Sequence, residues 1–166
     1  RLDMAKQQQH KTNAQREVEA AGFAASYHGI DVEDGFSFTG AQLAEILGED
    51  PDRVFKTLVT QGKSGEHYVF MIPVACELDL KKAATVVGEK SVAMIKAKEL
   101  LSLTGYVHGG CSPLGMKKAF PTAIDETAAL YDTICFSAGR VGHQIEMSPS
   151  DLAKLIDLTF ADLTAI

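Results

Sequence analysis

Apolar residues recur along the chain in short runs that glycine, proline and polar turn residues interrupt, a pattern typical of short helices and strands. Thr39, Asp79 and Ser148 each stand where a helical pattern begins, and side-chain oxygens at such positions cap helices. The segments predicted to be helical are 4–21, 39–48, 80–87, 97–103 and 149–156.

Segments rich in β-branched and aromatic residues predict strands. These segments are 23–32, 54–60, 68–73, 91–95, 122–124, 133–137, 143–147 and 160–166. Two of them, 54–60 and 68–73, flank Gly62-Lys63-Ser64-Gly65 and are predicted to form a hairpin. Strands outnumber helices and do not alternate regularly with them, so we expect an α+β fold with a mixed, mostly antiparallel sheet surrounded by helices.

Length and composition are those of an ordinary globular protein. The chain has 166 residues, 46% of them hydrophobic and 23% charged, and we expect one domain over residues 4–166. Met4 resembles a natural first residue, so Arg1, Leu2 and Asp3 are expected to be left over from an expression vector. No long apolar run and no signal-peptide pattern are present, which predicts a cytoplasmic protein without a membrane partner.

Charge is distributed unevenly along the chain, whose formal net charge is −6. Residues 76–120 contain seven lysines and four acidic residues, a balance of +3, whereas the remainder carries −9. A basic strip on an acidic body suits a partner that is negative in one region only. The alternative is that these lysines only keep helix faces soluble.

The segment 105–118 contains four glycines and one proline, a composition that predicts an irregular, shaped loop. At Gly109 and Gly110 the absence of Cβ atoms allows the backbone to approach a ligand and direct N–H groups toward it. Lys117 and Lys118 follow, and they favour an anionic ligand such as a phosphate or a nucleotide 3′ end. The alternative is an ordinary glycine-rich connection.

Lys56 interrupts the apolar strand 54–60, and by strand alternation it shares a face with Val54 and Leu58. Because removing an ammonium group from water is costly, we expect Lys56 to line a cleft and meet an anion there. The alternative is a lysine that extends to solvent from a sheet edge. The neighbouring Thr57 is expected to face the other way unless a bulge turns it.

Nucleophilic side chains are present, but none has the surroundings of a catalytic nucleophile. Ser137 ends an apolar strand without a G-x-S-x-G elbow, so it is expected to orient a ligand, and Arg140 is expected to contact phosphate. Cys111 with His108 leaves a thiol-dependent hydrolase open as an alternative, although no third orienting group is evident. The cysteines form no C-x-x-C pair, and no metal site and no cofactor are predicted.

Three motifs resemble the YbaK/EbsC family of bacterial trans-editing aminoacyl-tRNA deacylases, which are related to the editing insertion of prolyl-tRNA synthetases. They are 55–58, 104–118 and 136–146, within a similarity that spans roughly residues 22–164. The resemblance implies a YbaK-like, barrel-like sheet and an enzyme that clears cysteine mischarged onto proline tRNA. It also implies tRNA as the partner, with prolyl-tRNA synthetase as a second one.

The same resemblance implies roles for individual residues. Lys56, Gly109 and Gly110 correspond to the catalytic positions, with Lys56 at the 3′-terminal phosphates of the tRNA and the glycines facing the ester. The substrate-binding positions are Thr57, Ser137, Ile30, Ser112, Pro113, Arg140 and Lys117. The implied mechanism is attack of the substrate cysteine's thiol on its own ester carbonyl, for which the protein supplies positioning and polarisation.

Two positions depart from the family pattern. Ile30 stands where an aromatic residue is expected, and Gln144 stands where some members carry an aspartate. Either change can alter the amino-acid preference, so a deacylase for alanine or serine stays open. A binding module for tRNA ends or nucleotides, without catalysis, also explains the basic strip and the glycine loop.

Overall fold

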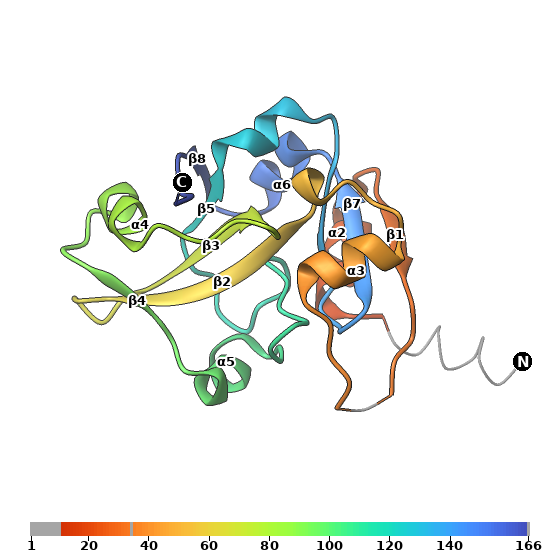
Figure 1. Cartoon of the computed structure of the whole chain (residues 1–166), viewed down its shortest axis with the longest axis horizontal. Coiled ribbons are helices and arrows are strands. Elements are labelled where there is room, and N and C mark those ends of the chain that lie inside the picture. The colour runs from red at the N-terminus through yellow and green to blue at the C-terminus, as the bar shows by residue number, and fades with distance from the viewer. Residues whose placement is uncertain (1–10, 34, 166) are drawn as a thin grey trace, which may run out of the picture.

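The computed structural model describes residues 11–33 and 35–165, which form two sheets with helices around them (Figure 1). A five-stranded sheet has the order β4-β2-β3-β5-β8, and a three-stranded sheet has the order β1-β7-β6. The strands are β1 (Ser26–Gly29), β2 (Phe55–Gly62), β3 (His67–Pro73), β4 (Val92–Met94), β5 (Thr122–Asp125), β6 (Ile134–Ser137), β7 (His143–Met147) and β8 (Leu158–Ala161). Pairing is antiparallel except along β3-β5-β8, which confirms the predicted α+β class.

Helices begin where capping side chains were predicted. Thr39 accepts a hydrogen bond from the backbone N–H of Gln42, and Asp79 and Ser148 cap the two helices that follow them. The α-helices are α2 (Asn13–Ala21), α3 (Gly40–Ile46), α4 (Leu80–Val87), α5 (Ala97–Thr104) and α6 (Pro149–Leu155), with short 3₁₀ turns η1 (Pro51–Arg53) and η2 (Glu126–Leu130). No helix within the described ranges is both long and apolar enough to cross a membrane.

Several predicted boundaries differ from the structure. The last strand begins at Leu158 and ends at Ala161, because its residues pair in parallel with β5, and the segment predicted over 160–166 is wrong in extent. Helix α2, the first within residues 11–33, begins at Asn13, where Thr12 provides the cap. Residues 1–10, which include the predicted vector remnant and the start of this predicted helix, lie outside the described residues. The described strands do not close into a barrel, and a bridge between Val54 and Cys135 connects the two sheets.

The two faces of the three-stranded sheet pack against different parts of the chain, and the cleft lies on one of these faces. On one face Phe136 and Ile145 pack against Ala14 and Val18 of α2 in the main apolar core. On the other face Cys135 packs with the start of β2 and with α3, which Figure 1 shows on the opposite side of β7 from α2. Strand alternation therefore directs Ser137 and Gln144, which are register partners, toward α3 and β2.

Candidate active site

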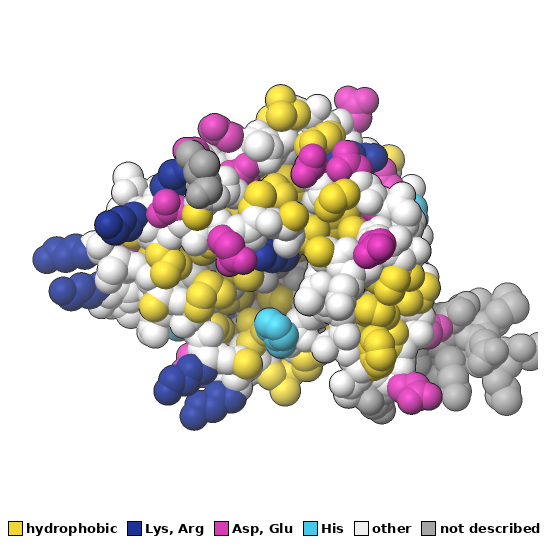
Figure 2. Space-filling view, in the orientation of Figure 1, with side chains coloured by type: hydrophobic (Ala, Val, Ile, Leu, Met, Phe, Trp, Pro, Cys, Tyr) yellow, Lys and Arg dark blue, Asp and Glu magenta, His cyan; other side chains and the backbone are white. Residues whose placement is uncertain are grey.

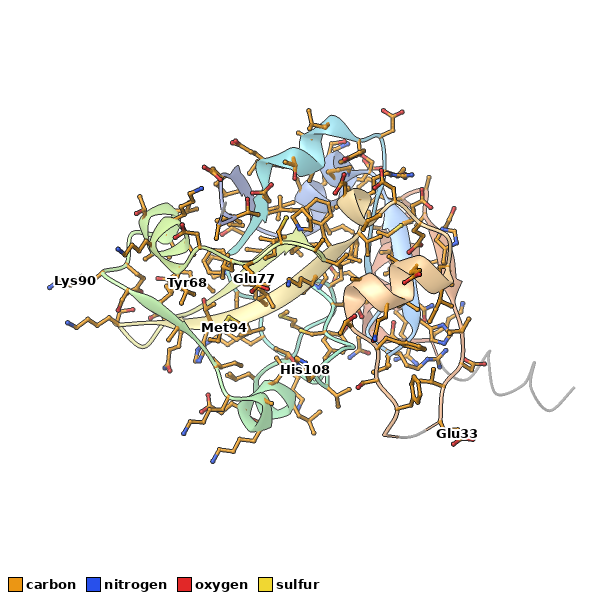
Figure 3. All side chains as sticks on the ribbon, viewed as in Figure 1. Glu33, Tyr68, Glu77, Lys90, Met94 and His108 are labelled. Carbon is orange, nitrogen blue, oxygen red and sulfur yellow. The ribbon has the colours of Figure 1, made fainter. Side chains whose placement is uncertain are left out.

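A cleft of about 470 Å³ lies where β2, the start of α3, the glycine-rich loop and the β6–β7 turn come together. The space-filling view shows a hollow near the centre of this face (Figure 2), with Lys and Arg side chains gathered toward its left and lower left. Met94 and His108, which line the cleft, lie between β2 and α5 (Figure 3). The first part of β2 can border the cleft because β4 pairs with β2 only from Thr60 onward.

Lys56 lies on β2 in the wall of the cleft and is only partly buried. Its register partner is Ile72, which belongs to an apolar cluster that also includes Leu58, so the predicted apolar surroundings are present. Lys56 makes no hydrogen bond or ion pair with any described residue. A cation in a cleft without a counter-ion is available to bind an anionic ligand.

Thr57 also lines the cleft, on the side of β2 that faces the three-stranded sheet. Its Oγ1 atom is buried and has no hydrogen-bond partner, and the same is true of Oε1 of Gln144, which also lines the cleft. Ser137 lines the cleft next to Gln144, and its Oγ accepts a hydrogen bond from the N–H of Gly139 at 3.1 Å. Its hydroxyl proton is therefore free to be donated elsewhere.

The two adjacent loop glycines have different structural roles. Gly109 lines the cleft with φ +85°, a left-handed backbone conformation that favours glycine, and a Cβ atom there would make only ordinary contacts, the nearest at 3.8 Å to Cγ2 of Val141. Gly110 is buried and lies outside the cleft lining. A Cβ atom on Gly110 would lie 3.0 Å from the backbone N of Val141, so this glycine allows two backbone segments to pack closely.

The segment that follows, 112–118, does not line the cleft. Ser112 and Pro113 are buried, and Ser112 Oγ accepts a hydrogen bond from the N–H of Leu114. Leu114 is fully buried, and Tyr106 donates its hydroxyl hydrogen to the Leu114 carbonyl at 2.6 Å. Lys117 is exposed beside Gly105. These contacts hold the loop that presents Gly109.

Ile30 and Arg140 also lie outside the lining of the cleft, on the connections that border it. The N–H of Ile30 donates to the carbonyl of Gly142 at 2.9 Å. Arg140 Nη2 lies 3.1 Å from Nε2 of His143, which is 2.8 Å from a carboxylate oxygen of Asp31. Burial, and then the charge of Arg140, lowers the pKa of His143, against the opposing effect of Asp31. These contacts connect the segment after β1 to the β6–β7 turn.

The structure therefore brings Lys56, Thr57, Gly109 and Ser137 together from three separate parts of the chain. It adds Gln144, which the sequence marked only as a departure from the family pattern. It also adds Phe38, Thr39 and Gly40 at the start of α3. The helix cap at Thr39 was recognisable in the sequence, but nothing in the local pattern indicated that this helix start borders a cleft.

Cys111 does not have the properties of a catalytic thiol. It is 7% exposed, and burial raises the pKa of its thiol to about 12, so the thiolate is scarce at neutral pH. His108 is exposed and forms no hydrogen bond with Cys111 or any other described residue. The geometry therefore counts against a thiol-dependent hydrolase. Within the described residues, no group of three or more His, Cys, Asp or Glu residues is placed to hold a metal ion.

The model of the aminoacyl-tRNA editing domain family matches residues 37–155. The Enterococcus faecalis protein named "Putative Cys-tRNA(Pro)/Cys-tRNA(Cys) deacylase EbsC" is 45% identical over 160 residues, which is 96% of each chain. The proline–tRNA ligase of Pelobacter propionicus is 31% identical over 85 residues, 51% of this chain and 15% of the ligase.

A solved structure has the same fold. The crystal structure described as "a putative trans-editing enzyme for prolyl tRNA synthetase" matches with a TM-score of 0.81 and 26% identity, covering 93% of this chain and 96% of that chain. The resemblance inferred from the three sequence motifs is thereby confirmed. Since the family model spans more than half of the chain and a 45% identical relative spans nearly all of it, the chain belongs to the aminoacyl-tRNA editing domain family.

Proposed function

We propose that the chain removes cysteine from mischarged Cys-tRNA(Pro), and that the substrate's own thiol cleaves the aminoacyl ester. The observation that carries the proposal is a cleft that holds an unpaired lysine, Lys56, but no activated nucleophile among its described lining residues. The Enterococcus faecalis relative bears the name of a deacylase for the same mischarged tRNA, which supports this choice of substrate.

The proposed roles follow from where each group lies. Lys56 binds a 3′-terminal phosphate through a charge-assisted contact. The backbone of Gly109 and the free hydroxyl hydrogen of Ser137 polarise the ester carbonyl. Gly110 and the buried Ser112 and Pro113 act through the loop, because they hold Gly109 in place without touching the cleft.

The proposed reaction needs no nucleophile from the protein. The thiol sulfur of the substrate cysteine bonds to the carbonyl carbon, the ester C–O bond breaks, and the thiol proton ends on the ribose oxygen of the released tRNA. The products are free tRNA and a cyclic thioester, which water opens to cysteine. Holding the thiol close to its own carbonyl supplies the rate enhancement, since intramolecular reactants can have very large effective concentrations.

The proposed partners are aminoacylated proline tRNA and the prolyl-tRNA synthetase that produces it, which locates the proposed activity in the cytoplasm. The basic strip of residues 76–120 supports a polyanionic partner, because Lys96 borders the cleft itself. The similarity to part of a proline–tRNA ligase supports a relationship to that synthetase.

A turnover experiment tests the proposal. Proline tRNA charged with cysteine, alanine, serine or proline is incubated with catalytic amounts of protein, and release of the amino acid is measured. We expect many turnovers on Cys-tRNA(Pro) and little release of proline. Stoichiometric protection of the ester without turnover would instead identify a binding module, and preferential release of alanine or serine would overturn the cysteine assignment.

A further inference from the structure

Two buried polar atoms in the cleft lack a hydrogen-bond partner. Gln144 is only 3% exposed, and the Oε1 atom of its side chain makes no hydrogen bond. Oγ1 of Thr57, which lines the same cleft, is likewise buried and unpaired. Buried polar groups are nearly always hydrogen-bonded in folded proteins, so two such atoms in one cleft indicate where a polar part of a ligand binds.

The charges around these atoms limit which group can bind there. The titratable side chains lining the cleft are Lys56 from β2, Lys96 before α5, His108 and Cys111 from the loop, and His143 from β7. None of the described lining residues is an aspartate or glutamate. Asp31 lies outside the lining and is engaged by His143 at 2.8 Å and by Arg140 at 3.8 Å. An ammonium group would therefore enter a cleft lined by two lysines and by no carboxylate among the described residues.

Position within the sheet connects Gln144 to the reacting ester. Gln144 and Ser137 are direct register partners on β7 and β6, and such partners have Cβ atoms roughly 5 Å apart. In an aminoacyl ester the α-amino group is attached to the carbon next to the carbonyl. A substrate whose carbonyl meets the Ser137 hydroxyl therefore places its α-amino group within reach of the Gln144 amide.

We propose that Gln144 and Thr57 bind the α-amino group of the aminoacyl ester in its uncharged form. An uncharged amine donates a hydrogen bond to Oε1 of Gln144 and accepts one from the hydroxyl of Thr57, so both unpaired atoms gain partners. Protonation removes the acceptor and adds a charge without a counter-ion. This inference rests on the proposed function, and it specifies the chemical form of the substrate that the site selects.

Binding of stable analogues tests the inference without the chemical step. The probe is an adenosine that carries alanine on a 3′ amide in place of the ester, and the matched control carries propionate, which lacks only the amino group. Alanine avoids the titration of a substrate thiol, and the propionyl analogue reports any pH effect that comes from the protein itself. Dissociation constants are measured by calorimetry between pH 6.5 and 8.5.

For the wild-type protein we expect the alanyl analogue to bind about tenfold more tightly at the upper end of this pH range than at the lower end, because an α-amino group has a pKa of about 8. The propionyl analogue should show no such increase. Gln144→Met should weaken the alanyl analogue at pH 8.5 at least fivefold and leave the propionyl analogue unchanged. Gln144→Glu supplies a counter-ion for the ammonium form, so the variant should bind the alanyl analogue more tightly at low pH than at high pH.

Other results overturn the inference. If the affinity of the wild-type protein for the alanyl analogue does not change with pH, or increases toward low pH, the ammonium form binds. Equal affinity of the wild type and Gln144→Met shows that the amide does not contact the amino group, provided that both unfold at similar temperatures. If neither analogue binds at any pH, the proposed function fails and this inference fails with it.

Discussion

The glycine-rich segment 105–118 and the β6–β7 wall contribute to the cleft in opposite ways. The segment is the most conspicuous part of the sequence, yet Ser112, Pro113 and Leu114 are buried as structural support and Gly109 is its exposed backbone at the cleft. The wall carries Ser137 and Gln144, which no motif rule singles out as catalytic, and it presents an unpaired amide oxygen and a free hydroxyl hydrogen.

The contrast shows that a conspicuous motif can serve mainly to hold a loop in place. Close packing of Gly110 against the backbone at Val141 connects the two regions, so the loop is positioned by the wall that faces it. If this interpretation is correct, substitutions should separate groups that meet the substrate from groups that shape the cleft.

Lys56→Ala should lower deacylation of Cys-tRNA(Pro) about ten- to a hundredfold, because a charge-assisted contact is worth about 1.5–3 kcal/mol. Steady-state deacylation assays measure the effect, and the melting temperature should change little because Lys56 has no partner among the described residues. Lys63→Ala, in an exposed position on the β2–β3 turn and outside the basic strip, is the matched control and should behave as wild type. Full activity in folded Lys56→Ala would remove Lys56 from the site.

Gly110→Val should destabilise the fold by about 1–3 kcal/mol, the usual cost of overpacking, as well as impair activity. The reason is the 3.0 Å approach of its Cβ position to backbone that cannot easily move. At Gly109 an alanine methyl group has room, although the backbone φ is strained for alanine. Compared with Gly110→Val, Gly109→Ala should therefore affect activity more than stability. Urea unfolding with parallel activity assays separates the two, and identical behaviour of the variants would contradict their different roles.

Glu146→Gln should cost about 1 kcal/mol of stability at neutral pH, since its partners are partly in water. Hydrogen bonds from Thr133 and then His28, with the charges of His28 and Arg53, lower the pKa of Glu146. A folded-state pKa below the unfolded value of about 4.3 stabilises the fold above that value, and the stabilisation is lost as pH falls through the folded pKa. The difference between wild type and variant should therefore shrink below about pH 4, and a constant difference would argue against an electrostatic origin.

Cys111→Ser and His108→Ala should have the smallest effect and retain most of the deacylation activity. The thiol is buried with its pKa raised to about 12, and His108 forms no hydrogen bond with it. Activity assays and mass spectrometry of the quenched reaction provide the measurement. Loss of activity in both variants would favour the thiol-dependent alternative.

Local elements were predictable from sequence wherever short-range chemistry decides them. The β2–β3 hairpin follows from apolar alternation around Gly62 to Gly65, and the caps at Thr39, Asp79 and Ser148 follow from their side-chain oxygens. The parallel placement of β5 and β8 did not follow, because pairing between distant strands leaves no local signal. For this reason the last strand was predicted too late in the chain.

The candidate site was predictable only in part. Lys56 was recognisable as a charge among apolar strand residues, and Gly109 as a glycine with a special backbone requirement. Gly110 was expected to face the ester, but its role depends on contact with residues 140–141, which only the folded chain reveals. The unpaired state of Gln144 likewise depends on what surrounds it in three dimensions.

The most direct test of the central claim compares wild-type deacylation of Cys-tRNA(Pro) and Ser-tRNA(Pro), which differ by one atom. If the substrate supplies the nucleophile, the cysteinyl ester should be cleaved much faster, because a thiol is far more ionised near neutral pH than a hydroxyl. Equal rates for the two esters, or a covalent adduct trapped on Cys111, would contradict substrate-assisted cleavage.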